Sequence, residues 1–326
     1  MIRVAMLSKW HVHAEGYARD VQNSGVAKIT CVWDEDARRG RAWAEELGVD
    51  FEADLAACLA REDVDAVVID TPTSDHRDVM VAAANAGKHI FTEKAMAPTL
   101  AECREITAAV EKNGVKFAIS HPQLTSPFVQ YAKKVLAEGL LGEVKFLRLR
   151  SAHDGSSGGW LPDYWYDVEK AGGGAMMDLG CHPMYTAAWL LGKPKRITSM
   201  FNNSYALNDV DDNAVSVVEF ENGAIAVLET GFVTPWSGGC TELLGTEGAL
   251  VMTDGVVKLR SKKLGVDGWV IPAALPKPMK STMALWFDGI LNDSPIPFGT
   301  AEGEALTNLL EQAYVSDRDQ TIVAFE

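Results

Sequence analysis

Hydrophobic and polar positions alternate between two periods over the first 120 residues, and this alternation predicts a parallel sheet wrapped by helices. Short runs rich in β-branched residues predict strands at residues 2–7, 27–33, 66–69, 89–92 and 116–119. Longer amphipathic stretches between them predict helices at residues 14–23, 36–47, 75–86 and 100–112. We therefore predict a doubly wound α/β domain over residues 1–122.

The pattern changes after residue 122. It predicts helices at residues 126–138, 176–191 and 302–315, and a strand at 144–150 that leads into an aromatic-rich loop at 151–170. Shorter alternating runs separated by glycine turns predict strands at residues 197–205, 214–219, 224–231, 241–244, 249–253 and 256–260. Residues 123–326 are therefore expected to form an α+β domain with a mostly antiparallel sheet.

Composition narrows the classes of function and the location. The 326 residues carry a formal net charge of −15, which would on average repel nucleic acid or an anionic membrane surface. No run approaches the roughly 18 apolar residues of a membrane span, and no signal-peptide core precedes Lys9. Five scattered cysteines form no C-x-x-C pair, so we expect reduced thiols and a cytoplasmic protein.

The turn after the first strand is where a dinucleotide-binding domain normally has a glycine-rich loop, because backbone N–H groups must approach a pyrophosphate closely. Ser8, Trp10 and His13 stand in the three glycine positions of this chain. His11 and His13 are interpreted either as packing and helix-capping residues or as contacts to phosphate or substrate. A metal site has suitable residue types but only two nearby ligands, so we predict no metal.

Asp34 follows the second strand at a spacing suited to accepting hydrogen bonds from an adenosine ribose. Its charge would repel a 2'-phosphate, whereas Arg38 and Arg39 would soften that repulsion. These residues predict NAD rather than NADP as the cofactor. The alternative is that Asp34 only caps the helix that begins near Asp36.

Two further motifs place ionisable groups where chemistry is expected. Glu93 and Lys94 end the strand at residues 89–92, and ligands bind at that edge of an open α/β sheet. Asp178 and His182 follow three consecutive glycines, four residues apart and on one face if the segment is a helix.

At this point the sequence resembles the family of glucose-fructose oxidoreductase, inositol dehydrogenase and the rhizopine-catabolism proteins (Gfo/Idh/MocA). The ordered motifs that carry the resemblance are Ala86-Gly87-Lys88-His89 before Glu93-Lys94, Gly172-Gly173-Gly174 before Asp178 and His182, Asp211-Asp212-Asn213, and Gly245-Thr246-Glu247-Gly248. The resemblance implies an N-terminal Rossmann domain and a C-terminal domain for substrate binding and oligomerisation. It also implies that Lys94, Asp178 and His182 form the catalytic group.

The physical logic of these three residues agrees with oxidation of a secondary alcohol. His182 would act as the base, Asp178 would support its charged form, and Lys94 would donate to the reacting oxygen. The alternative is a buried salt-bridge cluster. Because Ala95 stands where the family has proline, we expect a trans bond between Lys94 and Ala95. Tyr185 stands where the family often has aspartate, and Pro183 predicts a late start or a bend in the helix.

The remaining candidates complete two sets of contacts. The expected cofactor contacts are Ser8, Trp10, His11, His13, Asp34, Arg38, Thr71, Pro72, Thr73, His76, Glu93 and Lys94. Aromatic rings among carboxylates suit a sugar, so the expected substrate contacts are His121, His153, Asp154, Trp160, Tyr164, Trp165 and Tyr185. The aromatic loop could instead be an oligomer contact or close the core.

We predict an NAD-dependent oxidoreductase that acts on a carbohydrate, cyclitol or glycoside. Two alternatives remain: an NAD-using lyase or glycoside-cleaving enzyme that works by transient oxidation, and a non-catalytic nucleotide- or sugar-binding sensor. The expected partners are the small-molecule substrate and further copies of the chain, a dimer or tetramer formed through the C-terminal sheet.

Overall fold

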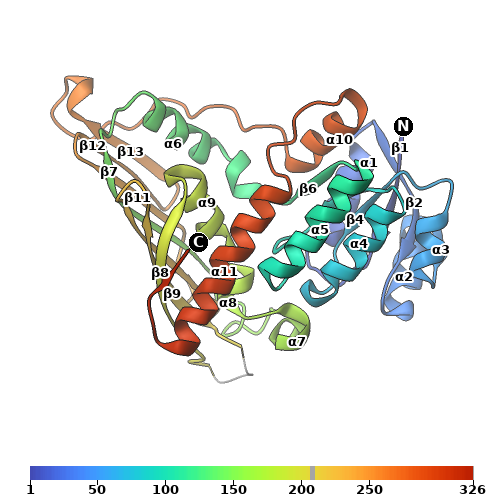
Figure 1. Ribbon diagram of the computed structural model, residues 1–326. Helices are drawn as coiled ribbons and strands as arrows, with labels where there is room; N and C mark the ends of the chain where they lie inside the picture. The colour runs from blue at the N-terminus through green and yellow to red at the C-terminus, as the bar shows by residue number, and fades with distance from the viewer. Residues whose placement is uncertain (206–209, 326) are drawn as a thin grey trace. The chain divides into compact units, whose positions relative to one another are not determined.

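The computed structural model describes residues 1–205 and 210–325, which belong to two compact units (Figure 1). Unit 1 comprises residues 1–121 and 280–307, and unit 2 comprises residues 122–279 and 308–326. Each unit is built around its own sheet. Within the described residues, no helix combines the length and the apolar character that crossing a membrane requires.

Unit 1 contains a six-stranded parallel sheet in the order β3-β2-β1-β4-β5-β6, which is the order of a Rossmann domain. The strands are β1 (Ile2–Leu7), β2 (Ala27–Trp33), β3 (Asp50–Glu52), β4 (Ala66–Ile69), β5 (His89–Thr92) and β6 (Phe117–Ile119). All four residues of β4 are buried, as expected for a parallel sheet covered by helices on both faces. The predicted α/β fold class is confirmed.

The helices of unit 1 are α1 (Ala14–Asn23), α2 (Ala37–Leu47), α3 (Leu55–Ala60), α4 (His76–Asn85), α5 (Leu100–Asn113) and α10 (Thr282–Asn292). Two of them, α2 and α5, begin and end at strong local signals. Asp36 caps α2 by accepting two backbone N–H groups, and Thr99 with Glu102 forms a capping box on α5. Gly48 and Gly114 end these two helices in the left-handed conformation.

The core of unit 1 includes a segment from late in the chain. Met283, Trp286 and Phe287 of α10 pack in the same buried cluster as Phe91 of β5 and Ala118 of β6. Residues 280–307 therefore lie in unit 1, whereas the sequence analysis assigned all of residues 123–326 to the second domain. The pattern of α10 shows that it is buried but does not show against which sheet.

Unit 2 contains an eight-stranded sheet in the order β13-β12-β11-β7-β10-β9-β8-β14. The strands are β7 (Val144–Ala152), β8 (Pro194–Asn202), β9 (Asn213–Phe220), β10 (Ile225–Gly231), β11 (Cys240–Gly245), β12 (Gly248–Thr253), β13 (Val256–Ser261) and β14 (Val323–Ala324). Within this sheet, β7 with β10 is the only parallel pair that the described residues form. The predicted mostly antiparallel sheet is confirmed.

Helices cover one face of this sheet (Figure 1). They are α6 (Pro127–Ala137), α8 (Ala175–Asp178) and α9 (Cys181–Leu191), together with the later residues of α11 (Thr300–Asp319). The short helix α7 (Val168–Ala171) instead packs on the turn at Asp163–Tyr166. The single helix predicted at residues 176–191 is wrong, because the chain breaks between α8 and α9. Gly180 packs so closely on Met176 that a Cβ would lie 2.4 Å from its sulfur, and Pro183 is tolerated in the first turn of α9.

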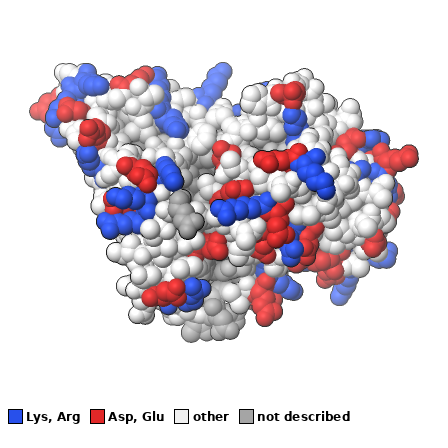
Figure 2. All heavy atoms as spheres, in the orientation of Figure 1, with Lys and Arg blue, Asp and Glu red and all other residues white. Residues whose placement is uncertain are grey.

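The other face of the unit 2 sheet carries charged and apolar side chains. Glu229 of β10 forms ion pairs with Arg148 and Arg150 of β7, and Glu219 of β9 pairs with Lys195 and Arg196 of β8. On the face of the molecule shown in Figure 2, basic and acidic side chains are also intermingled. The excess of acidic residues is therefore partly offset by local pairing.

Candidate active site

Polar side chains gather where the parallel strands of unit 1 end. Ser8 follows β1, Asp34 follows β2, Asp70 follows β4, and Glu93 with Lys94 follows β5; all five are buried. The carboxyl edge of a parallel sheet is where ligands bind in open α/β folds. Unit 1 therefore has a cluster of ionisable groups at the expected edge.

In the turn between β1 and α1, a residue other than glycine adopts a backbone conformation that glycine normally adopts. Ser8 has φ of +75°, a left-handed conformation that residues other than glycine rarely adopt. Its hydroxyl accepts the backbone N–H of Trp10 at 3.0 Å, and both side chains are buried. The path of the turn is thus retained, and the space that glycines would leave open is filled by side chains.

Asp34 is fully engaged within unit 1. Its carboxylate accepts backbone N–H groups from Lys9 at 2.9 Å and Asp36 at 2.8 Å. The guanidinium of Arg39 donates to it twice, through Nε at 2.9 Å and through Nη2 at 2.7 Å. Of the two arginines considered for this position, Arg39 contacts Asp34, whereas the backbone N–H of Arg38 donates to Asp36 at 2.9 Å.

Glu93 connects β5 to the turn that follows β1. Its carboxylate accepts a hydrogen bond from the His13 ring at 2.7 Å, another from the backbone N–H of Lys94 at 2.7 Å, and a third from the hydroxyl of Tyr17. Burial alone would raise the pKa of Glu93, but the charges of His11 and Lys94 and the bond from His13 hold it well below its usual value.

Asp70 lies one residue beyond β4 and has a different environment. It is completely buried, and neither carboxylate oxygen has a hydrogen-bond partner among the described residues. Burial, and after it the charge of Glu93, raises the pKa of Asp70 well above its usual value. Sequence analysis missed Asp70 and Tyr17. A carboxylate directly after the apolar run at residues 66–69 is the signal that could have found Asp70.

The bond between Lys94 and Ala95 is cis, so the expectation of a trans bond is wrong. That expectation used only the local preference of the peptide bond, whereas Ala95 is held by its tertiary surroundings. Its side chain is buried, and its carbonyl oxygen lies 2.9 Å from Nδ1 of His76. Nε2 of the same ring lies 3.2 Å from the carbonyl oxygen of Thr71. His76 thus braces the loops after β4 and β5.

Unit 2 places His182 near the start of α9 and Asp178 at the end of α8. The break between these helices means that the two residues do not share one continuous helical face. Nδ1 of His182 lies 2.7 Å from the hydroxyl of Tyr185, and that oxygen accepts the backbone N–H of Gln123 at 3.2 Å. Tyr185 is itself buried, so it contacts His182 from within the fold.

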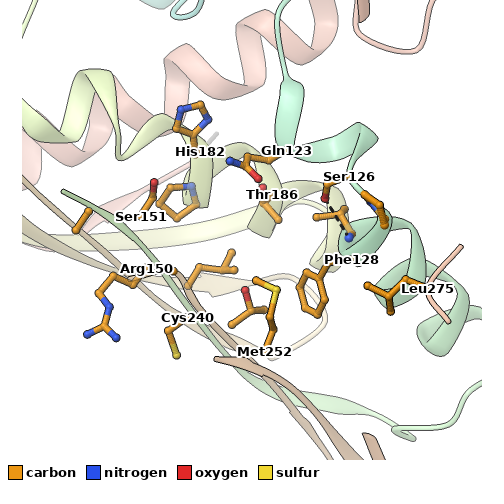
Figure 3. Close-up of a pocket in the computed structure, with 17 residues that line it drawn as sticks. Gln123, Ser126, Phe128, Arg150, Ser151, His182, Thr186, Cys240, Met252 and Leu275 are labelled. Atoms are coloured by element: carbon orange, nitrogen blue, oxygen red, sulfur yellow. Dashed lines mark hydrogen bonds between the residues drawn. The ribbon is translucent and has the colours of Figure 1, made fainter. Parts of the chain in front are cut away.

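A pocket of about 390 Å³ in unit 2 includes His182 in its wall (Figure 3). Its lining is formed by Gln123, Ser126, Pro127, Phe128, Val129, Leu149, Arg150, Ser151, Ala152, His182, Pro183, Thr186, Gly239, Cys240, Thr241, Met252 and Leu275. Arg150 is the one lysine, arginine, aspartate or glutamate of this lining, and in Figure 3 its guanidinium points away from the centre. The pocket thus combines one imidazole with hydroxyl, amide and apolar groups.

The aromatic loop forms a compact structure of its own. His153 stacks on Phe232 with ring centres 5.1 Å apart, and the indole of Trp160 donates to Asp154 at 3.0 Å. Trp160 is exposed, Tyr164 is half-buried and Trp165 is buried. None of these residues lines the pocket around His182. His121, expected to contact substrate, is buried in unit 1 beside Phe298.

In the structure, the expected site residues form three separate groups. Ser8, Asp34 and Arg39 form one group, His11, His13 and Glu93 a second, and His182 with Tyr185 a third. Lys94 belongs to unit 1, whereas Asp178 and His182 belong to unit 2.

Two family models match the chain. Residues 9–121 match the model described as the oxidoreductase family with an NAD-binding Rossmann fold. Residues 129–251 match the model of the Gfo/Idh/MocA C-terminal domain. Together they cover five of the six strands of the parallel sheet, β1 excepted, and most of the strands of the second sheet.

Named proteins show the same relationship. The 2,7-anhydro-N-acetylneuraminate hydratase of Mediterraneibacter gnavus is 31% identical over 229 residues, 69% of this chain and 60% of that protein. The scyllo-inositol 2-dehydrogenase (NAD(+)) of Bacillus subtilis is 29% identical over 250 residues, 74% of this chain and 69% of that protein. The crystal structure of GenD2 from gentamicin A biosynthesis, in complex with NAD, has a TM-score of 0.85 at 24% identity and covers 100% of this chain and 96% of its own. That likeness shows the fold.

Proposed function

Because this chain belongs to the Gfo/Idh/MocA family of oxidoreductases with an NAD-binding Rossmann fold, we propose that it transfers hydride between a secondary alcohol and nicotinamide. The substrate class we propose is a carbohydrate, cyclitol or glycoside. The observation that carries the proposal is that both family models match in order, with Lys94 at the end of β5 and His182 in the wall of a pocket.

The residues at the carboxyl edge of unit 1 fit a dinucleotide. The left-handed Ser8 keeps the turn that leads into α1, whose first backbone N–H groups suit a pyrophosphate. We assign Ser8, Trp10, Thr71, Pro72 and Thr73 to this contact. Asp34 would accept the ribose hydroxyls once Arg39 gives up part of its bidentate contact, because four donors already engage the carboxylate. His11, His13, Glu93 and His76 are engaged with neighbouring residues, so we assign them to shaping this edge.

When bound, NAD supplies the acceptor for the hydride. His182 would take the proton of the substrate hydroxyl, and Tyr185 would orient its ring through Nδ1. Asp178 would stabilise the charged imidazole, and Lys94 would donate a hydrogen bond to the reacting oxygen. In this assignment Tyr185 acts through His182 and does not contact substrate.

The aromatic loop and the pocket suggest how a sugar is held. The exposed ring of Trp160 offers a surface on which the C–H face of a sugar could stack, and Asp154 lies beside it. Ser126, Ser151 and Thr186 offer hydroxyl groups in the pocket with His182. We therefore assign His153, Asp154, Trp160 and Tyr164 to substrate binding, and regard Trp165 and His121 as packing residues because they are buried.

The outer face of the unit 2 sheet supports a homo-oligomer. Met200, Val215, Ile225 and Leu244 are apolar side chains exposed on four strands, at 77%, 41%, 44% and 38% respectively. Burial of such a face against a second copy would remove apolar surface from water. We propose that this face forms a dimer or tetramer.

The five cysteines form no disulfide, which supports a reducing compartment such as the cytoplasm.

The experiment that tests the activity is a panel of sugars, cyclitols and glycosides with NAD, in which NADH absorbance is followed. The expected result is accumulation of NADH with at least one member of the panel. Absence of NAD binding by calorimetry at millimolar cofactor would overturn the proposal and favour a sensor.

A second candidate is a lyase or hydratase that oxidises one carbon transiently and restores the cofactor. It is favoured by the name of the Mediterraneibacter gnavus relative, which is a hydratase. The same panel separates the two activities when the products are analysed by mass spectrometry. A product with a gain or loss of water, formed without net NADH, would establish the second candidate.

A further inference from the structure

We propose that His11, His13 and Glu93 of unit 1 bind a divalent transition-metal ion. One ligand atom from each residue lies within 4.8 Å of the other two. Nδ1 of His13 is 2.7 Å from Oε1 of Glu93, and Nδ1 of His11 is 4.0 Å from the same oxygen. Ligands about 2.1 Å from a tetrahedral ion lie roughly 3.4 Å from each other, so the separations between ligand atoms need to change by about 1.4 Å or less to complete the site.

The backbone positions of the three residues are fixed independently. The N–H of His11 donates to the carbonyl of Asp70 at 3.1 Å, and His13 stands two residues later, immediately before α1. Glu93 follows β5 directly, and its second oxygen accepts the backbone N–H of Lys94. Outer hydrogen bonds of this kind orient metal ligands.

Three hydrogen bonds currently occupy the ligand atoms. The ring of His13 and the hydroxyl of Tyr17 both donate to Oε1 of Glu93, and Nδ1 of His11 accepts the backbone N–H of His13 at 3.1 Å. An ion would replace the bonds of the two imidazole rings with coordinate bonds, and the proton between His13 and Glu93 would leave to solvent. The His13 side chain is 46% exposed, which provides a route for the ion and for that proton.

A second observation concerns Asp70, which lies directly beside one of the three residues. Its backbone carbonyl accepts the N–H of His11 at 3.1 Å. Its carboxyl group is completely buried, and neither oxygen has a hydrogen-bond partner among the described residues. An ion held by His11, His13 and Glu93 would therefore add positive charge near a buried carboxyl group that lacks a partner, which is favourable.

The donor set indicates the class of ion. Two imidazole nitrogens and one carboxylate oxygen suit Zn²⁺, Fe²⁺, Mn²⁺ or Co²⁺, whereas Mg²⁺ and Ca²⁺ prefer oxygen ligands alone. A set of three protein ligands leaves a coordination position for water. The site is separate from the proposed oxidoreductase activity, since it is defined by ion binding whatever the chain does with NAD.

The test uses the full chain after removal of metal with a chelator. Titration with Co²⁺ should give visible d–d absorption that saturates at one ion per chain, and calorimetry with Zn²⁺ should give the same stoichiometry. His13→Gln should weaken Co²⁺ binding by about 100-fold or more, because it removes a direct ligand. His89→Gln, which alters the opposite end of β5, is the matched control and should bind as the wild type does.

Two results would overturn the proposal. The first is absence of saturable Co²⁺ and Zn²⁺ binding by the wild-type chain, an outcome that does not depend on any variant folding. The second is unchanged affinity and stoichiometry in both His13→Gln and Glu93→Gln, which would place the bound ion elsewhere. Neither measurement involves turnover. Absence of metal binding would therefore leave the oxidoreductase proposal standing, and absence of oxidoreductase activity would leave the metal-site proposal standing.

Discussion

The carboxyl edge of unit 1 and the pocket of unit 2 differ in the number of ionisable side chains that they contain. At the edge of unit 1, Asp34, Asp70, Glu93 and Lys94 are buried together, and most are engaged with other side chains or backbone groups. The pocket of unit 2 has His182 in a wall of hydroxyl, amide and apolar groups. Unit 1 therefore concentrates charge, whereas unit 2 presents a single imidazole. In the proposed function, unit 1 would therefore supply the charged groups around the cofactor, and unit 2 would supply the shape of the substrate pocket.

The largest expected effect comes from the residues assigned to the reaction itself. Lys94→Ala and His182→Ala should each lower kcat by about 100-fold or more, the scale of a lost proton-transfer or electrostatic group. The measurement is the rate of NADH formation with the best substrate of the panel. NAD affinity should fall far more for Lys94→Ala than for His182→Ala. Near-normal turnover of His182→Ala would remove this residue as the base.

The next effect concerns the choice of cofactor. Asp34→Ala should narrow the preference for NAD over NADP by about tenfold, because it removes the charge that repels a 2'-phosphate and releases Arg39. Calorimetry with both cofactors gives the ratio directly. Asp36→Ala is the control, since it removes the cap of α2 and leaves Asp34 in place. An unchanged ratio would mean that the ribose is recognised elsewhere.

A smaller effect on kcat is expected from Tyr185, whose hydroxyl contacts the imidazole of His182. Tyr185→Phe removes the hydroxyl from Nδ1 of His182 and should lower kcat by roughly tenfold with little change in KM, because orientation is lost while the pocket keeps its shape. Tyr166→Phe, which removes a hydroxyl that donates to Ser156, is the matched control. An equal loss in both variants would mean that Tyr185 has no special role.

The smallest expected effect is on thermal stability, and it compares the unpaired buried carboxyl group of Asp70 with the paired carboxylate of Asp65. The raised pKa of Asp70 means that its charged form is disfavoured in the fold, so at neutral pH the metal-free Asp70→Asn variant should be more stable than wild type. A gain of about 1 kcal/mol would raise Tm by roughly 2–4 °C. Asp65→Asn should do the opposite, because Arg3 donates to Asp65 at 2.9 Å. A lower Tm for Asp70→Asn would show that Asp70 has a stabilising partner.

Local signals account for the parts of the fold that could be predicted. Buried β-branched runs and glycine stops define β1, β2, β4 and β5 within a residue, because in a parallel sheet the pattern of each strand is decided by burial alone. The short β3 and α3 were missed since three or six residues show no period. The break between α8 and α9 was missed because the apolar pattern continues through it, and the close contact of Gly180 with Met176 is visible only in the folded chain.

Candidate site residues could likewise be predicted where their position follows from a local pattern, and not where it depends on a tertiary contact. Glu93, Lys94 and Asp34 could be placed at strand ends, since the position of a strand end follows from the strand itself. Arg39 could be considered as a neighbour of Asp34, because it follows that residue by five positions. The contact of Tyr17 with Glu93 could not be foreseen, because it joins elements 76 residues apart and a pattern along the chain does not contain such a contact.

The late segment that completes unit 1 has a consequence for how the protein is made. All six strands of the parallel sheet are present once Ile119 has left the ribosome, yet Trp286, which is completely buried against Phe91, is synthesised much later. Until then the nascent chain exposes the apolar face that α10 covers, and this face is open to chaperones or to association with other nascent chains. A fragment that stops at residue 121 would keep that exposure permanently, so residues 122–279 of unit 2 must be translated before unit 1 can finish folding.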